Sequence, residues 1–225
     1  MKKNNHCCEL MVKFTNDPRI GISYISEFRK YYIDLLGGGA IQTIFCCPFC
    51  CSRLPQGLRD EYFNILEKEY NVDDPYDEEQ LKRLPEEFKS DAWWKKRKIK
   101  AKKTNPPKKS KSQKTKHCCE DMDSFLEEKK VGIFYNPIYR DYFILMNSYP
   151  NGKQVIYGCP WCGYNFPRSL IEKREEVLEK EYKAHYDSHL DKFLKITEHL
   201  SYPKEATNVP EEEFKSDEWW KKRGL

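Results

Sequence analysis

Long hydrophobic runs are missing from this sequence of 225 residues, in which hydrophobic residues make up 39% and charged residues 34%. No apolar stretch approaches the roughly 20 residues that a membrane-spanning helix needs. The start of the chain, Met1 to His6, also lacks the apolar segment of a secretory signal. We therefore expect a protein with no membrane partner that is located in the cytoplasm, where thiols stay reduced.

Several catalytic patterns are absent as well. The sequence has no glycine-rich phosphate loop and no serine–histidine–aspartate signature. His185 and His189 have the i, i+4 spacing of a zinc-protease helix, but Tyr186 stands where that motif requires glutamate. These absences favour surface histidines and a protein that is not an enzyme.

Cysteine, in contrast, is abundant, with ten residues in the chain. In a reducing compartment, so many cysteines indicate metal ligands more than disulfides. Each half of the chain has a His-Cys-Cys-Glu motif followed by a Cys-x-x-Cys knuckle, and zinc prefers four nitrogen or sulfur ligands. We therefore expect two Zn²⁺ ions per chain. The predicted ligands are Cys7, Cys8, Cys47 and Cys50 for the first ion, and Cys118, Cys119, Cys159 and Cys162 for the second.

The choice of ligands leaves an alternative open. Side chains of adjacent residues point in opposite directions on an extended chain, so two neighbouring cysteines rarely bind one ion. His6 or His117 is then the alternative ligand in place of the first cysteine of each pair. Cys46 and Cys51 flank the first knuckle and are predicted to be spare thiols, with substitution as metal ligands as the alternative. A redox Cys-x-x-Cys motif and buried, inert thiols are the other interpretations of these cysteines.

The sequence also repeats itself. His6-Cys7-Cys8-Glu9 recurs as His117-Cys118-Cys119-Glu120 at an offset of 111, and the knuckles align at an offset of 112. The endings Ser-Asp-x-Trp-Trp-Lys-Lys-Arg align at an offset of 126, which implies a 14-residue insertion in the second copy. This pattern predicts a tandem duplication with one repeat at 1–97 and a second at 117–225.

The segment between the repeats, 98–116, has nine lysines and no acidic residue. The repeats themselves carry net charges of −1 and −4, which the linker turns into the overall +4. Such a basic tract is expected to be disordered and extended. It is a candidate contact for nucleic acid, although a solvated spacer is the simpler interpretation.

Each repeat is expected to have an α+β fold. In the first, residues 20–25, 28–36 and 41–45 predict a three-stranded antiparallel meander that runs into the knuckle, by the alternation of apolar and polar residues. An amphipathic helix follows, with Leu58, Tyr62, Ile65, Leu66 and Tyr70 on one face. In the second repeat, Arg174 replaces Tyr62, so that face is less apolar.

Two further segments complete the prediction. The insertion, at about 183–208, is expected to be helical, because Tyr186, Leu190, Phe193, Leu194 and Thr197 continue a helical stripe. Each Ser-Asp-x-Trp-Trp ending is expected to form a short helix with at least one tryptophan docked on its domain. The predicted partner-binding residues are Trp93, Trp94, Trp219 and Trp220.

These motifs resemble a family of small bacterial cytoplasmic proteins of unknown function. The resemblance rests on His-Cys-Cys-Glu, Cys-Pro-Trp-Cys-Gly and the Trp-Trp-Lys-Lys-Arg-Gly-Leu ending, and it covers nearly the whole chain twice. The first copy departs from the pattern at Cys51, where the family has glycine. The resemblance implies a zinc-ribbon-like unit without an established activity, and a size like that of immunity proteins.

Taken together, the sequence predicts a zinc-stabilised bivalent protein-binding module, immunity-like or regulatory, whose protein partner is unidentified. Two linked binding sites would raise avidity. The first alternative is a nucleic-acid-binding zinc-ribbon protein that uses 98–116, and the second is a thiol redox enzyme.

Overall fold

The computed structural model describes residues 6–15, 17–74, 77–103, 115–146, 152–188, 190–195 and 205–225. The chain divides into two compact units. The larger unit comprises Met1–Phe134 and Phe143–Phe166, and the smaller comprises Tyr135–Tyr142 and Pro167–Leu225. This division differs from the expected repeats at 1–97 and 117–225, because both Cys-x-x-Cys knuckles belong to the larger unit. Below, N-terminal half means 6–103 and C-terminal half means 115–225.

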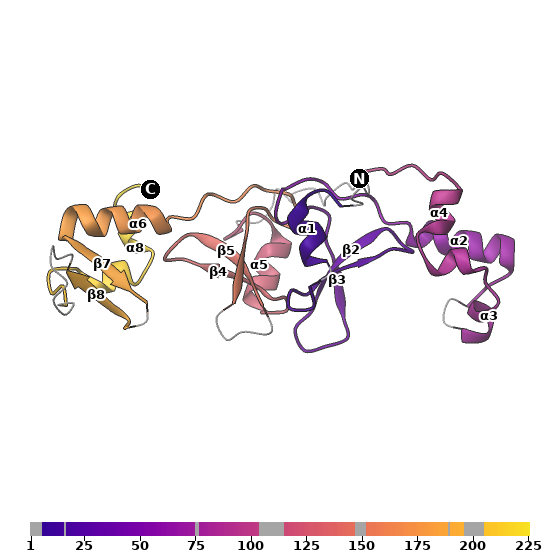
Figure 1. The fold of residues 1–225 in the computed structure, drawn as a ribbon, viewed down its shortest axis with the longest axis horizontal. Coiled ribbons are helices and arrows are strands. Elements are labelled where there is room, and N and C mark those ends of the chain that lie inside the picture. The colour runs from indigo at the N-terminus through magenta and orange to yellow at the C-terminus, as the bar shows by residue number, and fades with distance from the viewer. Residues whose placement is uncertain are drawn as a thin grey trace. The chain divides into compact units, whose positions relative to one another are not determined.

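The N-terminal half begins with helix α1 (Glu9–Phe14) and an antiparallel sheet (Figure 1). Its strands β1 (Ile22–Ile25), β2 (Lys30–Asp34) and β3 (Ile41–Thr43) are paired in chain order. Ile33 of β2 lies opposite Ile22 of β1 and Gln42 of β3. The predicted meander is therefore confirmed, with strands shorter than expected.

Helices of the same half form a separate hydrophobic cluster. Helix α2 (Arg59–Tyr70) ends at Asn71, which has the left-handed conformation common after helices. Helix α3 (Glu78–Lys82), the 3₁₀ turn η1 (Glu86–Lys89) and helix α4 (Ala92–Lys96) follow. The buried cluster consists of Leu58, Tyr62, Leu66, Val72, Leu84, Phe88 and Trp93. The predicted apolar face of α2 thus supplies its two buried residues, Tyr62 and Leu66.

Part of the predicted linker is folded. The Lys102 carbonyl accepts a 2.7 Å hydrogen bond from the Gln56 amide, and the Ile99 carbonyl accepts a 3.1 Å bond from the Arg29 guanidinium. Ile99 also packs against the helical cluster. Residues 98–103 therefore belong to the N-terminal half, while 104–114 lie outside the described residues.

The C-terminal half repeats the early elements. Helix α5 (Glu120–Glu127) precedes a sheet of β4 (Ile133–Asn136), β5 (Asp141–Leu145) and β6 (Lys153–Ile156), paired in that order. Helix α6 (Ile171–Val177) continues into a π-helical turn, η2 (Leu178–Tyr182). Short helices α7 (Glu211–Phe214) and α8 (Glu218–Lys221) end the chain. Helices and antiparallel strands together make an α+β fold.

The predicted helical insertion is wrong over its described part. Strands β7 (Ala184–Asp187) and β8 (Lys192–Lys195) form an antiparallel hairpin in which Tyr186 lies opposite Phe193. Lys183 adopts the left-handed conformation and ends the preceding helix. A small number of apolar residues can match both the helical and the strand periodicity. Aromatic side chains, which this segment contains, favour strands. The expected continuation through 196–204 lies outside the described residues.

In each half, the first tryptophan of the pair links the last helix to the turn after the first strand of the sheet. Trp93 and Trp219 are fully buried, and their indole nitrogens donate 2.7 Å hydrogen bonds to the carbonyls of Glu27 and Ile138. Complete burial removes these two residues from any docking surface. The prediction that at least one tryptophan of each pair docks on its domain is therefore confirmed.

Trp93→Phe is expected to lower the free energy of unfolding by about 1–3 kcal/mol, because it leaves the Glu27 carbonyl without its buried donor. The neighbouring Trp94 is partly exposed and bonds the Ser26 carbonyl at 2.9 Å. Water can replace that bond, so Trp94→Phe is expected to cost less than about 1 kcal/mol. Urea unfolding of both variants measures the difference, and equal losses would contradict the assignment.

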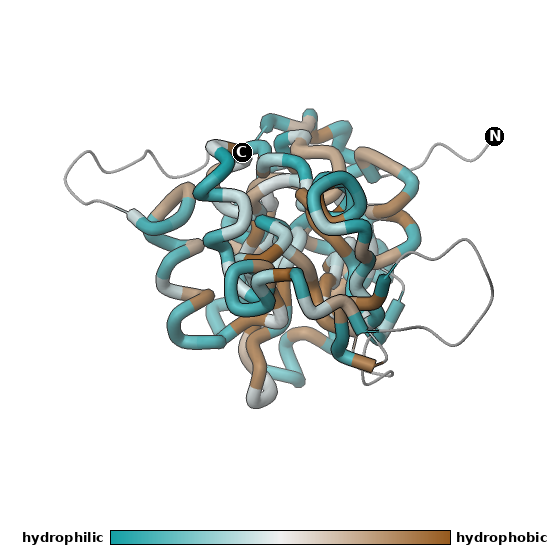
Figure 2. Tube along the Cα trace, turned by 90° about the vertical axis from the view of Figure 1, so that its left-hand side faces the viewer, coloured by the Kyte–Doolittle hydropathy of each residue, from teal (hydrophilic) through white to brown (hydrophobic). Residues whose placement is uncertain are grey.

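Hydrophobic residues occur in short stretches along the chain, as the colours of Figure 2 show. Among the described residues, no helix is both long and apolar enough to span a membrane.

Candidate metal centre

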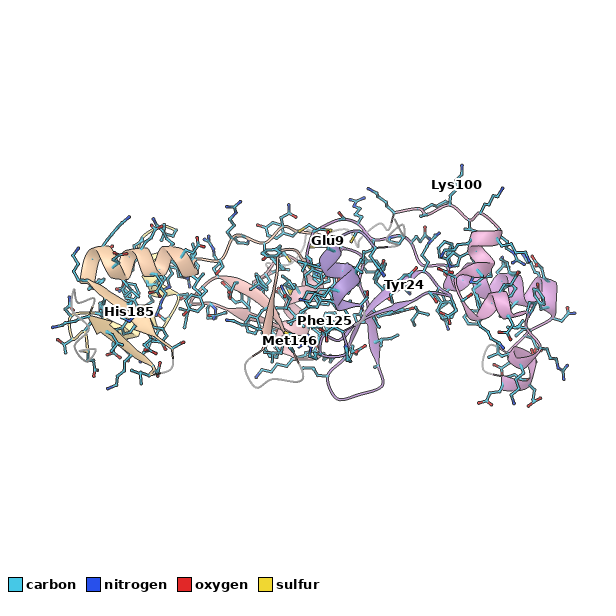
Figure 3. All side chains as sticks on the ribbon, viewed as in Figure 1. Glu9, Tyr24, Lys100, Phe125, Met146 and His185 are labelled. Carbon is cyan, nitrogen blue, oxygen red and sulfur yellow. The ribbon has the colours of Figure 1, made fainter. Side chains whose placement is uncertain are left out.

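Four thiols of the N-terminal half meet in one place. The sulfurs of Cys7, Cys8, Cys47 and Cys50 all lie within 4.8 Å of one another. Cys8 is the N-cap of α1, which begins at Glu9 (labelled in Figure 3), and its sulfur accepts a 3.4 Å hydrogen bond from the Met11 amide. Cys47 and Cys50 come from the turn that follows β3.

The C-terminal half builds an equivalent cluster. The sulfurs of Cys118, Cys119, Cys159 and Cys162 also lie within 4.8 Å of one another. Cys119 is the N-cap of α5, the helix that carries Phe125 (Figure 3). All eight cysteines expected as ligands are thus brought together in two groups of four. We call these groups cluster 1 and cluster 2.

Adjacent cysteines enter each cluster, although the alternation of side chains on an extended strand disfavours this. The reason lies in the local backbone. Residues 6–8 form a bend rather than a strand, and Cys8 is the last extended residue before the chain turns into α1. Because the chain changes direction between the two cysteines, their side chains can converge.

The sulfur positions fit a tetrahedral metal ion. Bonds of about 2.3 Å from zinc to each thiolate place the four sulfurs about 3.8 Å apart. The distances are 3.8 Å from Cys8 to Cys47, 3.6 Å from Cys7 to Cys50, and 3.7 Å from Cys119 to Cys159. A disulfide would need about 2.05 Å, so the spacing favours a shared ion.

Backbone amides and neighbouring thiols stabilise negative charge on some of the sulfurs. The amides of Cys50 and Cys162 each donate a 3.5 Å hydrogen bond, to the sulfurs of Cys47 and Cys159 respectively. A hydrogen bond with Cys7 lowers the pKa of Cys47 to about 5, whereas burial raises the pKa of Cys8 to about 11. Four thiols this close cannot all ionise alone, because each thiolate opposes the next. A divalent cation would remove that opposition.

The histidines of the two motifs lie outside the clusters. The ligand groups among the described residues contain only cysteine. The His6 ring nitrogen Nδ1 hydrogen-bonds the Tyr31 hydroxyl at 2.8 Å, and the ring packs edge-on against Tyr24. Burial lowers the pKa of both His6 and His117. The geometry therefore favours four cysteines over the histidine alternative at each site.

The aromatic residue of each knuckle packs against a phenylalanine of the neighbouring helix. Phe49, which stands between the thiols of cluster 1, packs against Phe14 of α1 with ring centroids 5.0 Å apart. Trp161 of cluster 2 stacks on Phe125 at 4.6 Å and is fully buried. Each contact fixes a knuckle against the helix that directly follows the other two thiols of its cluster.

The two knuckles are bonded to each other, which sequence reasoning missed. The Pro160 carbonyl accepts hydrogen bonds from the amides of Phe45 (2.8 Å) and Cys46 (2.9 Å). Reciprocally, the Pro48 carbonyl accepts bonds from the amides of Tyr157 (2.7 Å) and Gly158 (3.1 Å). Because main-chain groups make all four bonds, no residue type marks them in the sequence.

Cys46 and Cys51, predicted to be spare thiols, lie in this contact between the knuckles. A Cβ atom at Gly163 would come within 2.7 Å of the Cys46 sulfur, and one at Gly158 within 2.5 Å of the Cys51 sulfur. Cys51 also donates to the Tyr157 carbonyl at 3.4 Å. The equivalence of Cys46 with Gly158, and of Cys51 with Gly163, was the available signal, since each cysteine lies against the opposite glycine.

Two arginines and one histidine outside the clusters contact groups that stabilise the fold or lie exposed on a strand. Arg29 is buried and donates to the carbonyls of Gln56 and Ile99 rather than to an acid. Arg140 lies over the Trp220 ring, with its Cζ 5.4 Å from the centroid. His185 is exposed on β7 (Figure 3), so it is not on a helix as expected, and His189 lies outside the described residues.

Comparison with known proteins adds one match. The chain shows no significant similarity to a curated protein or to a solved structure. Residues 1–96, which contain cluster 1 and all helices of the N-terminal half, match the model of a family described as a domain of unknown function (DUF6980).

Proposed function

We propose that this protein is a non-catalytic, bivalent protein-binding module, built by tandem duplication and stabilised by two structural Zn²⁺ ions. The observation that carries the proposal is the convergence of four sulfurs in each cluster, all within 4.8 Å of one another. Four protein ligands leave no open coordination position for a substrate, as in structural zinc sites and unlike catalytic ones. Each half then corresponds to a zinc-ribbon-like unit.

Zinc is favoured by the ligand set. Four thiolates at tetrahedral positions suit Zn²⁺ or iron, and both clusters offer sulfur alone. Zinc has no redox chemistry of its own, which suits a site whose task is to hold a knuckle closed.

Protein binding is supported by a groove in the larger unit whose lining is part polar and part apolar. The groove has a volume of about 490 Å³, and its lining includes Asp34 and five glycines together with Leu36, Ile41 and Leu145, which are 41–49% exposed. Large apolar side chains gathered in one groove are typical of interaction sites. Trp94 and Trp220, one in each half, are partly exposed and remain the proposed partner-binding tryptophans, and Leu36, Ile41 and Leu145 provide further apolar surface.

Elemental analysis of the purified protein tests the proposal. We expect two zinc ions per chain, and one in a variant with Cys159→Ser and Cys162→Ser, because that variant loses half the ligands of cluster 2. Cys46→Ala is the matched control, since Cys46 is a cysteine outside both clusters, and it is expected to retain two ions. Iron in place of zinc, or no metal at all, would contradict the proposal.

A thiol redox enzyme is the second candidate, and the lowered pKa of Cys47 favours it. Reduction of insulin disulfides separates the two. The binding module is expected to show no turnover above that of free thiols, whether loaded with zinc or stripped. Turnover that disappears in Cys47→Ser would establish the redox enzyme instead.

A further inference from the structure

Main-chain hydrogen bonds link residues that directly neighbour the predicted ligands of the two clusters. Pro48 directly follows the predicted ligand Cys47, and its carbonyl is bonded to the amide of Gly158, which directly precedes the predicted ligand Cys159. The reverse path is the same, from the Pro160 carbonyl after Cys159 to the Cys46 amide before Cys47. One ligand of each cluster is therefore held in place by the peptide next to a ligand of the other.

Side chains reinforce this contact at two points. The sulfurs of Cys46 and Cys51 fill the space that the absent side chains of Gly163 and Gly158 leave free. Cys46 is buried to 1% exposure, which shows how closely the contact is packed. Neither glycine could carry a side chain without displacing a sulfur.

We propose that clusters 1 and 2 form one cooperative metal-binding unit, in which closing either knuckle around its ion prepares the other. This inference rests on the proposed structural metal sites and concerns how they are filled. A metal-free knuckle must order its turn before its two sulfurs can bind. The first ion closes one knuckle and fixes its proline carbonyl, so the second knuckle gains a positioned hydrogen-bond partner before it binds.

The coupling is reciprocal by thermodynamic necessity, since each site raises the affinity of the other by the same factor. Native mass spectrometry of the full chain with one equivalent of Zn²⁺ measures it from the metal-free, one-metal and two-metal species. Two equal, independent sites leave about half of the chains with one ion. A coupling of roughly 5–150-fold lowers that fraction to between about one third and one thirteenth.

Gly158→Ala is the uncoupling variant, because its Cβ would lie 2.5 Å from the Cys51 sulfur. We expect its one-metal fraction to rise to about half or more. Cys51→Gly is the comparison variant, since glycine accepts the positive φ of 59° at this position. It removes the sulfur but keeps the main-chain bonds between the knuckles, so its one-metal fraction is expected to stay near the wild-type value. The double variant Gly158→Ala with Cys51→Gly restores room in the contact and is expected to return the one-metal fraction towards the wild-type value.

The outcomes separate the two proposals. A wild-type chain that binds two ions but leaves half or more of the chains with one ion overturns the coupling and leaves the structural sites intact. A wild-type chain that binds no metal overturns both. A double variant that still binds two ions but stays uncoupled shows that the contact of Cys51 with Gly158 is not the route.

Discussion

Stripping the metal is expected to abolish cooperative unfolding of the larger unit. Structural zinc contributes about 10–16 kcal/mol of apparent free energy in small zinc domains, which matches or exceeds the 5–15 kcal/mol stability of a typical domain. All ten cysteines lie in Met1–Phe134 and Phe143–Phe166, so both predicted ions stabilise the same unit. Circular dichroism during urea unfolding, with and without a strong zinc chelator, measures the loss.

The smaller unit serves as an internal control for this experiment. It contains no cysteine, and its hydrophobic core is built from residues of α6, the β7–β8 hairpin and the last two helices. Trp219 is fully buried in that core. We expect part of the tryptophan emission to keep its folded value after chelation, until urea unfolds this core separately. A chelated chain that keeps its full unfolding transition would contradict a structural role for the metal.

Replacing Arg174 with methionine is expected to destabilise the smaller unit by about 3 kcal/mol. Arg174 is only 1% exposed, and its guanidinium donates to the Phe214 carbonyl at 2.9 and 3.3 Å. Its charge lies among four aromatic rings, with centroid distances of 4.8 Å to Tyr186, 5.5 Å to Phe193 and Tyr139, and 5.9 Å to Phe214. Methionine fills similar space but offers neither a donor nor a charge.

The N-terminal half supplies a matched rescue for this variant. Tyr62 occupies the position equivalent to Arg174, and its hydroxyl donates to the Phe88 carbonyl at 3.2 Å, as Arg174 donates to Phe214. Arg174→Tyr is therefore expected to lose less than Arg174→Met. Lys173→Met is the control for a neighbouring exposed cation, with an expected change below about 0.5 kcal/mol. Urea unfolding followed by tryptophan fluorescence ranks the three variants, and equal losses for Arg174→Met and Lys173→Met would refute the buried role.

The sequence predicted the parts of this protein that depend on local patterns. Alternation of apolar residues placed the strand around Ile33, and spacing placed the buried face of α2 at Tyr62 and Leu66. The counting of thiols selected the four cysteines in each cluster, although a local rule argued against the adjacent pairs. That rule holds for a strand, and it failed because the chain bends at Cys8.

The remaining features depend on contacts that a local pattern does not encode. The hairpin of β7 and β8 was mistaken for a helix, because a few aromatic residues satisfy both periods until tertiary packing selects one. Because Arg174 stands where the first repeat has Tyr62, the sequence predicted a less apolar helix face in the second repeat. The arginine is instead buried against aromatic rings from other elements. The knuckles are paired through backbone groups, which no residue type reveals. The only indication in the sequence is that Cys46 and Cys51 of the first copy correspond to glycines in the second.

The difference between Phe49 and Trp161 at the centres of the two knuckles has an optical consequence. Indole emission is sensitive to nearby thiolates and to bound paramagnetic ions, whereas phenylalanine is almost silent. In the sequence, Trp161 lies between Cys159 and Cys162, and Phe49 holds the equivalent position between Cys47 and Cys50. Only one of the two knuckles therefore contains a tryptophan, and subtracting the spectrum of Trp161→Phe isolates the indole signal of that cluster. Exchanging Phe49 and Trp161 would move the signal to the other cluster, so that each can be followed in turn in an otherwise unlabelled chain.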